Sequence, residues 1–176
     1  MERIKSPIVQ FILKALLIYI IWYVVYEMWL LPDGRLDEWV SLNIVAVSNG
    51  LVQLFGFSTW AIHRIIGIGN NPGIELVDGC TGISAIGLFL GFILAYPGDW
   101  KKKISFSIIG IGVIYIVNII RIVILVITQD KWPKFFDFTH DYSTTTIFYI
   151  VIFLMWMLWV NITDGKFDSA KEKADA

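Results

Sequence analysis

Charged side chains are scarce in this chain, and their scarcity limits where it can fold. Of its 176 residues, 16% are charged and 57% are hydrophobic, whereas roughly a quarter of the residues in a soluble domain are charged. The net charge is −1 and the basic residues form no stripe, so no nucleic-acid partner is expected. This composition predicts that most of the chain lies in a lipid bilayer.

Side chains that bind metals are also few. The sequence has one cysteine and two histidines, so no internal disulfide can form. No tight spacing joins these residues to the scattered carboxylates, and a zinc-type site therefore fits poorly. A phosphate-binding loop and a serine nucleophile elbow are missing as well. We expect neither a metal nor any other cofactor.

Four apolar stretches are long enough to cross a bilayer, whose hydrocarbon core of about 30 Å takes about 20 residues of helix. They are residues 7–31, 80–96, 104–128 and 143–162. The first is too long for a signal-peptide core and no small-residue cleavage site follows it, so we expect it to be retained as a transmembrane helix. The sequence thus predicts an all-α polytopic membrane protein with about four transmembrane helices in a single domain.

Residues 39–57 form a further apolar stretch that also carries polar side chains. Those that fall broadly on one side of a helix are Ser41, Ser48, Asn49 and Gln53. Such an amphipathic helix could lie in the interface, re-enter the bilayer, or form a fifth span that faces other helices.

The basic residues favour one orientation of the chain. Lys101, Lys102 and Lys103 form the strongest basic cluster in a short loop, and Arg3 and Lys5 lie near the N-terminus. Because basic loops stay in the cytoplasm, the first span leaves the cytoplasm and the second returns to it. The chain between them then crosses the bilayer an even number of times, most simply zero. This places the amphipathic segment on the outer face and both termini in the cytoplasm.

The segment from residue 58 to residue 79 has a different character. Asn71-Pro72-Gly73 is a strong turn signal among alternating apolar residues, and it predicts a short hairpin-like outer segment before Cys80. The single membrane domain is therefore expected to have three parts. They are an N-terminal helix, amphipathic segment and outer loop (1–79), a three-helix region (80–162) and a charged cytoplasmic tail (163–176).

Three chemically distinct side chains meet the outer face in this topology. Cys80 begins the second span, Arg121 lies in the third at about 10 Å from its outer end, and His140 is in the loop before the fourth. An arginine within hydrocarbon costs at least about 2–3 kcal/mol. Arg121 either snorkels to the outer headgroups or is buried, partnered and functional, and we favour the second reading. Asn118 lies on the same helical face.

Cys80 and His140 are weaker signals when each is taken alone. A lone cysteine is usually a small buried hydrophobe, and a loop histidine is usually solvated. A helix start and a nearby cation would both favour the thiolate of Cys80, while Asp78 would either oppose it or cap the helix. His140 could serve as a general acid–base group. His63 is the competing histidine, although its apolar surroundings fit an interface anchor better.

Two short motifs carry a resemblance to a known family. Residues 75–83 (ELVDGCTGI) resemble the cysteine motif of the exosortase/archaeosortase family, and residues 118–122 (NIIRI) resemble its arginine motif. His140 falls where the exosortases carry their histidine. The resemblance covers residues 73–162, and larger members have more spans, so this chain resembles a compact form.

The resemblance implies a membrane cysteine protease-transpeptidase in the cytoplasmic (inner) membrane of a prokaryote, with its active site on the outer face. Its substrates would be exported proteins that carry a C-terminal motif, a transmembrane helix and a basic tail. Cys80 would form a thioester with the substrate and His140 would protonate the leaving amine. Arg121 would stabilise the thiolate or the oxyanion, with Asn118 and Asp141 as supporting residues. The product would pass to a surface anchor, with a lipid or glycolipid as acceptor.

Two non-enzymatic functions remain as alternatives. In a small transporter or channel subunit, Arg121 would bind an anion, and function would survive Cys80→Ala but not Arg121→Ala. In an assembly protein, Arg121 would pair with a carboxylate of another subunit, and Cys80 and His140 would both be dispensable.

Overall fold

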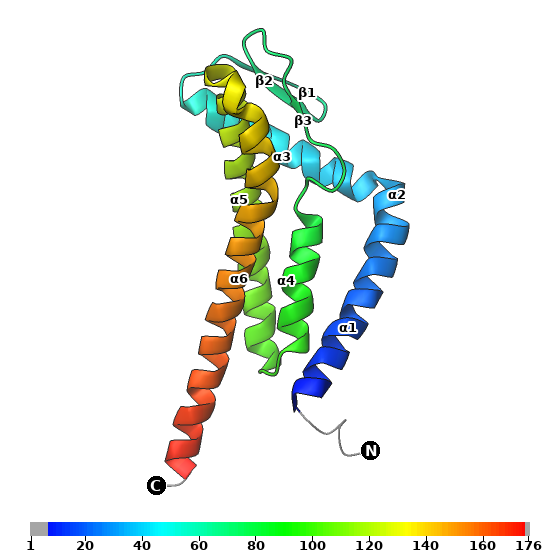
Figure 1. Cartoon of the computed structure of the whole chain (residues 1–176), viewed down its shortest axis with the longest axis vertical. Coiled ribbons are helices and arrows are strands. Elements are labelled where there is room, and N and C mark those ends of the chain that lie inside the picture. Colours follow the sequence, from blue (N-terminus) through cyan, green and yellow to red (C-terminus); the bar gives the residue numbers. More distant parts are fainter. Residues whose placement is uncertain (1–6, 175–176) are drawn as a thin grey trace.

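The computed structural model describes the backbone of residues 7–174 and the side chains of residues 8–136 and 146–163. Four helices, α1, α4, α5 and α6, pack along one another, and a small sheet and a crossing helix lie at one end of them (Figure 1). We name this end the sheet end. The opposite end, where α4 is joined to α5, is named the lysine end.

The first span is a helix with two extensions. α1 (Pro7–Val25) continues without a break through a π-helical turn (Tyr26–Leu30) and α2 (Leu31–Asp33). Gly34 ends the helix with a φ of 72°, the left-handed conformation in which many helices terminate. The described helix Ile8–Asp33 is long and apolar enough to cross a membrane, which confirms the first predicted span.

α3 (Arg35–Leu54) runs across the sheet end and not along the bundle (Figure 1). By length and composition it is not among the membrane-spanning helices found in the described part of the chain. Its polar face is turned inward, because Ser41 and Ser48 are buried whereas Trp39 is exposed. The amphipathic segment is therefore an element of the sheet end, and the fifth-span alternative is not supported.

Three short strands cover α3 and α5 at the sheet end. β1 (Thr59–Ile62), β2 (Ile65–Ile68) and β3 (Ile74–Glu75) form an antiparallel sheet in the order β1-β2-β3. This confirms the hairpin-like segment and adds one strand to it. The Nδ2 atom of Asn71, between β2 and β3, donates to Asp130 Oδ1 of α5 at 3.0 Å, so this turn is tied to the bundle.

α4 (Ile83–Ala95) is shorter than the second predicted span. Its 13 residues rise about 20 Å, less than the roughly 30 Å of hydrocarbon. The expectation that this helix begins at Cys80 is wrong, because the chain first makes a turn that ends at Gly82, whose φ is 84°. Glycine adopts this conformation without the clash that a Cβ would cause. Cys80 thus lies in a turn ahead of the helix.

α5 (Trp100–Lys131) and α6 (Pro133–Ala174) extend beyond the third and fourth predicted spans. α5 and the Thr146–Thr163 segment of α6 are both long and apolar enough to cross a membrane. The loop expected around His140 is wrong, because α6 already begins at Pro133. Proline suits this first helical position, where its missing N–H has no helical partner to lose.

Packing at the lysine end and along α4 fixes the bundle. A Cβ at Gly87 would lie 2.0 Å from Trp22 Cε2, so this glycine allows α1 to approach α4 closely. Lys103 is buried and its Nζ atom donates to the carbonyl oxygen of Leu94 at 3.0 Å, where the C-terminal dipole of α4 favours a cation. One lysine of the basic cluster is therefore used inside the protein.

Candidate functional site

Cys80 lies in the turn between β3 and α4, at the sheet end of the bundle. Its side chain is partly exposed, and its backbone N–H donates to the carbonyl oxygen of Val77 at 3.1 Å. Gly79 and Gly82 both have positive φ values, of 82° and 84°, and together they fold the chain back into α4. Two glycines close to the thiol thus serve a backbone conformation that other residues rarely adopt.

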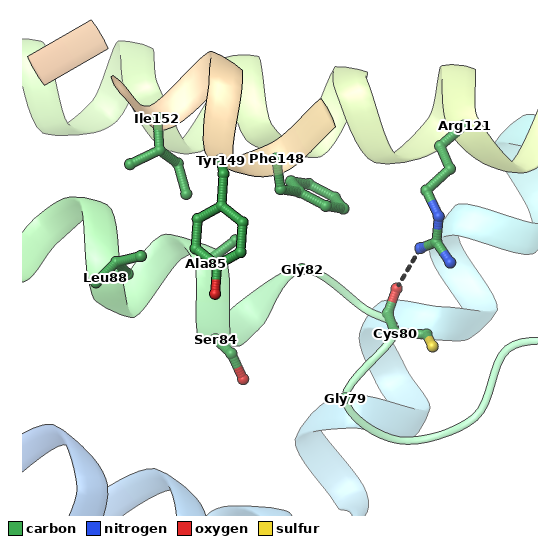
Figure 2. Close-up of a pocket in the computed structure, with 10 residues that line it drawn as sticks. All are labelled: Gly79, Cys80, Gly82, Ser84, Ala85, Leu88, Arg121, Phe148, Tyr149 and Ile152. Atoms are coloured by element: carbon green, nitrogen blue, oxygen red, sulfur yellow. Dashed lines mark hydrogen bonds between the residues drawn. The ribbon is translucent and has the colours of Figure 1, made fainter. Parts of the chain in front are cut away.

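Arg121 reaches this turn from α5. The side chain is 3% exposed, and its Nη1 atom donates to the Cys80 carbonyl oxygen at 3.4 Å and to Asn118 Oδ1 at 3.3 Å. Asn118 Nδ2 donates to the same carbonyl oxygen at 3.2 Å. The expectation of a buried and partnered arginine is confirmed, and the snorkelling alternative is wrong. Figure 2 shows that the Arg121 bond to Cys80 ends on the carbonyl oxygen and not on the sulfur.

Cys80 and Arg121 line one pocket of about 240 Å³. Its remaining walls come from the start of α4 and from α6, and Figure 2 shows the residues that form them: Ser84, Ala85, Leu88, Phe148, Tyr149 and Ile152. The thiol residue and the cation therefore share a cavity that is mostly apolar. In such surroundings electrostatic interactions are stronger than in water.

A second, almost wholly apolar pocket of about 370 Å³ continues along α4. It lies between α1 and α4, with Trp156 of α6 at its edge, and it shares Leu88 with the Cys80 pocket. The shared residue makes the two pockets neighbours on one face of α4. An apolar groove therefore runs from the thiol site toward the lysine end.

Asp37 is a component of the site that the sequence interpretation missed. This residue of the first turn of α3 is fully buried, and its Oδ1 atom accepts hydrogen bonds from the Thr81 hydroxyl at 2.7 Å and from the Gly79 N–H at 3.2 Å. The Tyr26 hydroxyl lies 3.1 Å from both carboxylate oxygens. One sequence signal could have found it. Asp37 falls on the same helical face as Ser41, four residues later.

Asp78 is paired with Arg64, the residue at the β1–β2 turn. Arg64 Nη1 and Asp78 Oδ1 are 2.6 Å apart, and the Arg64 carbonyl oxygen accepts the N–H of Leu76 at 2.9 Å. The expectation that Asp78 might cap the following helix is wrong, because the cap of α4 is Gly82 without a side-chain bond. The carboxylate instead ties the start of the Cys80 turn to the sheet.

The two histidines lie on different elements. The backbone of His140 and Asp141 belongs to α6, eight and seven residues before Phe148 of the pocket wall, and the side chains of both lie outside the described residues. His63 lies at the β1–β2 turn, where its Nε2 atom is 3.1 Å from Glu38 Oε1 and both side chains are well exposed. His63 is not among the residues that line the Cys80 pocket.

The arrangement combines a thiol, a buried guanidinium and an apolar cavity. A thiol next to a cation is the setting in which cysteine acts as a nucleophile. Among the described residues no group of three histidine, cysteine or acidic side chains could hold a metal ion. The expected supporting role of Asn118 has a physical basis, since its amide contacts both Arg121 and the Cys80 carbonyl.

Comparisons with known proteins point to one family. A protein-family model described as "Transmembrane exosortase" matches residues 6–157, a range that includes Cys80, Arg121 and His140. The probable archaeosortase D of Methanocaldococcus jannaschii is 31% identical over 157 residues, which cover 89% of this chain and 92% of that protein. No solved structure matches the chain.

Proposed function

Because the chain belongs to the exosortase/archaeosortase family of membrane proteins, we propose that it is a cysteine transpeptidase that cleaves C-terminal sorting signals of exported proteins. The observation that carries the proposal is the shared pocket of Cys80 and Arg121, in which the guanidinium is bonded to the peptide of the cysteine itself. We place the enzyme in the cytoplasmic membrane of a prokaryote, with the sheet end outside and both termini in the cytoplasm.

The proposed reaction proceeds through an acyl-enzyme. The Cys80 thiolate attacks the scissile carbonyl carbon, and the resulting oxyanion collapses to a thioester as the amine leaves with a proton from His140. The acceptor nucleophile then gives its proton to His140, attacks the thioester and releases the thiolate. The positive charge of Arg121 stabilises the anion at each tetrahedral stage. A lipid or glycolipid amine or hydroxyl group is the proposed acceptor.

The position of His140 on helix α6 supports its proposed role in proton transfer. The residue precedes Phe148 of the pocket wall by eight residues, which is about 12 Å toward the sheet end. Asp141 is proposed to orient the imidazole, as carboxylates commonly do for catalytic histidines. Both side chains belong to the element that forms one wall of the Cys80 pocket.

The apolar groove along α4 supports a route for the substrate. An exported protein with a C-terminal transmembrane helix would enter sideways from the lipid and lie against α1, α4 and α6. Its cleavage motif would then reach the Cys80 pocket through the junction at Leu88. The apolar lining suits a lipid-embedded helix, because such helices associate through close packing of side chains and not through charge.

The proposal is tested by Cys80→Ala in the native cell, followed by blotting of exported proteins that end in a helix and a basic tail. We expect these substrates to keep their full length and to remain in the membrane, because no thioester can form without the thiol. Normal processing of every such protein in the variant would contradict the proposal. It would favour the transporter or assembly alternative, in which Cys80 is dispensable.

The histidine assignment has a matched control within the chain. His140→Asn is expected to abolish processing, whereas His63→Asn, at the exposed β1–β2 turn, is expected to leave it unchanged. Asparagine is chosen because the φ of His63 is 54°, a conformation that asparagine tolerates better than most residues. Equal processing by the two variants would remove His140 from the mechanism.

A further inference from the structure

Four residues of the turn that carries the thiol, 78–81, are each held by a side chain from elsewhere in the chain. Asp78 is paired with Arg64. The carbonyl oxygen of Cys80 accepts hydrogen bonds from Asn118 and Arg121. Asp37 accepts hydrogen bonds from Gly79 and Thr81. Asp37 thus contacts the turn on both sides of the cysteine. We propose that Asp37 is the positioning residue of this turn and keeps the thiol in register with Arg121.

The chemistry of the three donors fits a carboxylate. The hydroxyl groups of Tyr26 and Thr81 and the N–H of Gly79 all point hydrogen at Asp37, and a carboxylate has about four lone-pair sites and no hydrogen to compete with them. An asparagine would keep one oxygen for these donors, but it would lose the negative charge that strengthens all three bonds, and its NH₂ group would replace Oδ2 beside the Tyr26 hydroxyl. The contacts thus select for the acid and not only for its size.

The Asp37 carboxylate is itself held in place by other parts of the protein. Tyr26 lies 3.1 Å from both oxygens of Asp37, which sets the rotation of the carboxyl group. Tyr26 is fully buried, and its ring stacks on Trp22 at a centroid distance of 5.4 Å. Asp37 also lies in the first turn of α3, where the helix dipole stabilises a negative charge. The Asp37 carboxylate that holds Gly79 and Thr81 is therefore itself held rigidly by α1 and α3.

Positioning has a chemical consequence because the bond from Arg121 ends on the carbonyl oxygen of Cys80. With the carbonyl fixed from α5 and both neighbouring residues fixed from α3, the direction of the Cys80 side chain is set by two independent elements. Reacting groups need placement to within a fraction of an ångström, and a misplacement of about 1 Å can cost about a hundredfold in rate. Loss of the Asp37 contacts would leave the Cys80 thiol in the site but wrongly oriented for reaction.

The test measures Cys80 directly and rests on the proposed function only for its second readout. Because the chain has one cysteine, the rate of alkylation by iodoacetamide in lipid nanodiscs reports on Cys80 alone. We expect Asp37→Asn to alkylate at least about threefold faster than wild type, because the released turn exposes a thiol that is now partly buried. We expect processing of a substrate to fall at least about tenfold, a loss of about 1.4 kcal/mol in barrier terms.

Matched variants separate positioning from a merely structural role. Glu38→Gln, the neighbouring acid on α3, is exposed and contacts His63 instead of the turn, so both rates should stay at the wild-type value. Tyr26→Phe and Thr81→Val each remove one donor to Asp37. Each should raise the alkylation rate and lower the processing rate, by less than Asp37→Asn does. They also carry the test should Asp37→Asn not fold. If Asp37→Asn lowers the melting temperature yet keeps both rates within twofold of wild type, Asp37 is structural only and the proposal is overturned.

The two proposals fail in distinguishable ways. Faster alkylation of Asp37→Asn in a protein whose wild type processes no exported substrate would support the positioning role and refute the transpeptidase. Cys80-dependent processing that persists unchanged in Asp37→Asn would support the transpeptidase and refute the positioning role.

Discussion

A single guanidinium connects the thiol turn to α5. Arg121 Nη1 donates both to the Cys80 carbonyl oxygen and to Asn118 Oδ1, and the planar guanidinium fixes the directions of its N–H bonds. A lysine carries the same charge as a compact point on a flexible stem. Charge alone is therefore not what holds this residue in place, since the geometry of two N–H bonds is also required.

Arg121→Lys is consequently expected to lose function although it conserves charge. Processing of the substrate should fall at least about tenfold, because a lysine lacks the planar guanidinium that fixes these N–H directions and its flexible stem holds the charge less firmly in a buried site. Arg35→Lys is the control, as Arg35 is exposed and lies 3.7 Å from Asp33, so its processing should match wild type. Blotting of substrate length over a time course measures both, and full activity of Arg121→Lys would contradict the geometric role.

Sequence alone predicted the site residue that differs sharply from its neighbours, but it did not predict the one that resembles them. Arg121 among isoleucines is costly enough to be noticed, and its burial and partners could be expected. Asp37 stands among polar residues just after a helix end, so it resembles an ordinary solvated acid. Its burial depends on the way α3 crosses the bundle, and the only local sign of it is the helical face that Asp37 shares with Ser41.

At the scale of elements, the short helix α4 lowers the thiol turn toward the bilayer. The helix rises about 20 Å, so its sheet-facing end stops below the ends of the longer α5 and α6 (Figure 1). The turn with Cys80 lies between this end of α4 and the sheet, and the apolar groove along α4 begins beside it. A helix of full length would have carried the thiol above the groove.

The junction at Leu88 gives a test of this groove. Leu88→Trp should block the passage between the two pockets that share this residue, and processing of membrane-anchored substrates should fall severalfold or more. Alkylation of Cys80 by iodoacetamide, which enters from water, should change little. Ile116→Trp, on an exposed position of α5 that is 55% accessible, is the control for added bulk. Equal processing by the two variants would mean that substrates take another route.

The helix ends show what hydrophobic periodicity can and cannot locate. The existence of the apolar helices followed from their length, because few other structures can satisfy the backbone within a bilayer. The start of α4 was misplaced by three residues, since the apolar pattern does not distinguish a glycine turn from a first helical turn. The start of α6 at Pro133 was missed because residues 137–145 are polar enough to resemble a loop.

For the whole molecule, the proposed orientation of the sheet end rests on charge. Lys101 and Lys102 are exposed at the lysine end, and the positive-inside rule would place them in the cytoplasm. The crossing helix α3 and the sheet would then face outward together with the Cys80 turn. The proposed cleavage of exported proteins depends on this direction, because such substrates would arrive on the outer side.

Orientation is measured with cysteines introduced into a Cys80→Ala background. Asn70→Cys, at the exposed turn after β2, should react with a membrane-impermeant maleimide in intact cells. Lys102→Cys should react only after the membrane has been permeabilised, because the cytoplasm shields it. The reverse labelling pattern would place the sheet end in the cytoplasm and would rule out an outward-facing transpeptidase.

The connections of the thiol turn also impose an order during biosynthesis. Tyr26 and Asp37 emerge from the ribosome before Cys80, whereas Arg121 follows the cysteine by 41 residues. A nascent chain can therefore form the Asp37 contacts to the turn soon after the thiol appears. It gains the contact from the Arg121 guanidinium only after α5 has been made. Until then the translocon holds a thiol without its cation. Under the proposed function, Cys80 would therefore become reactive only when α5 has packed against α1 and α4.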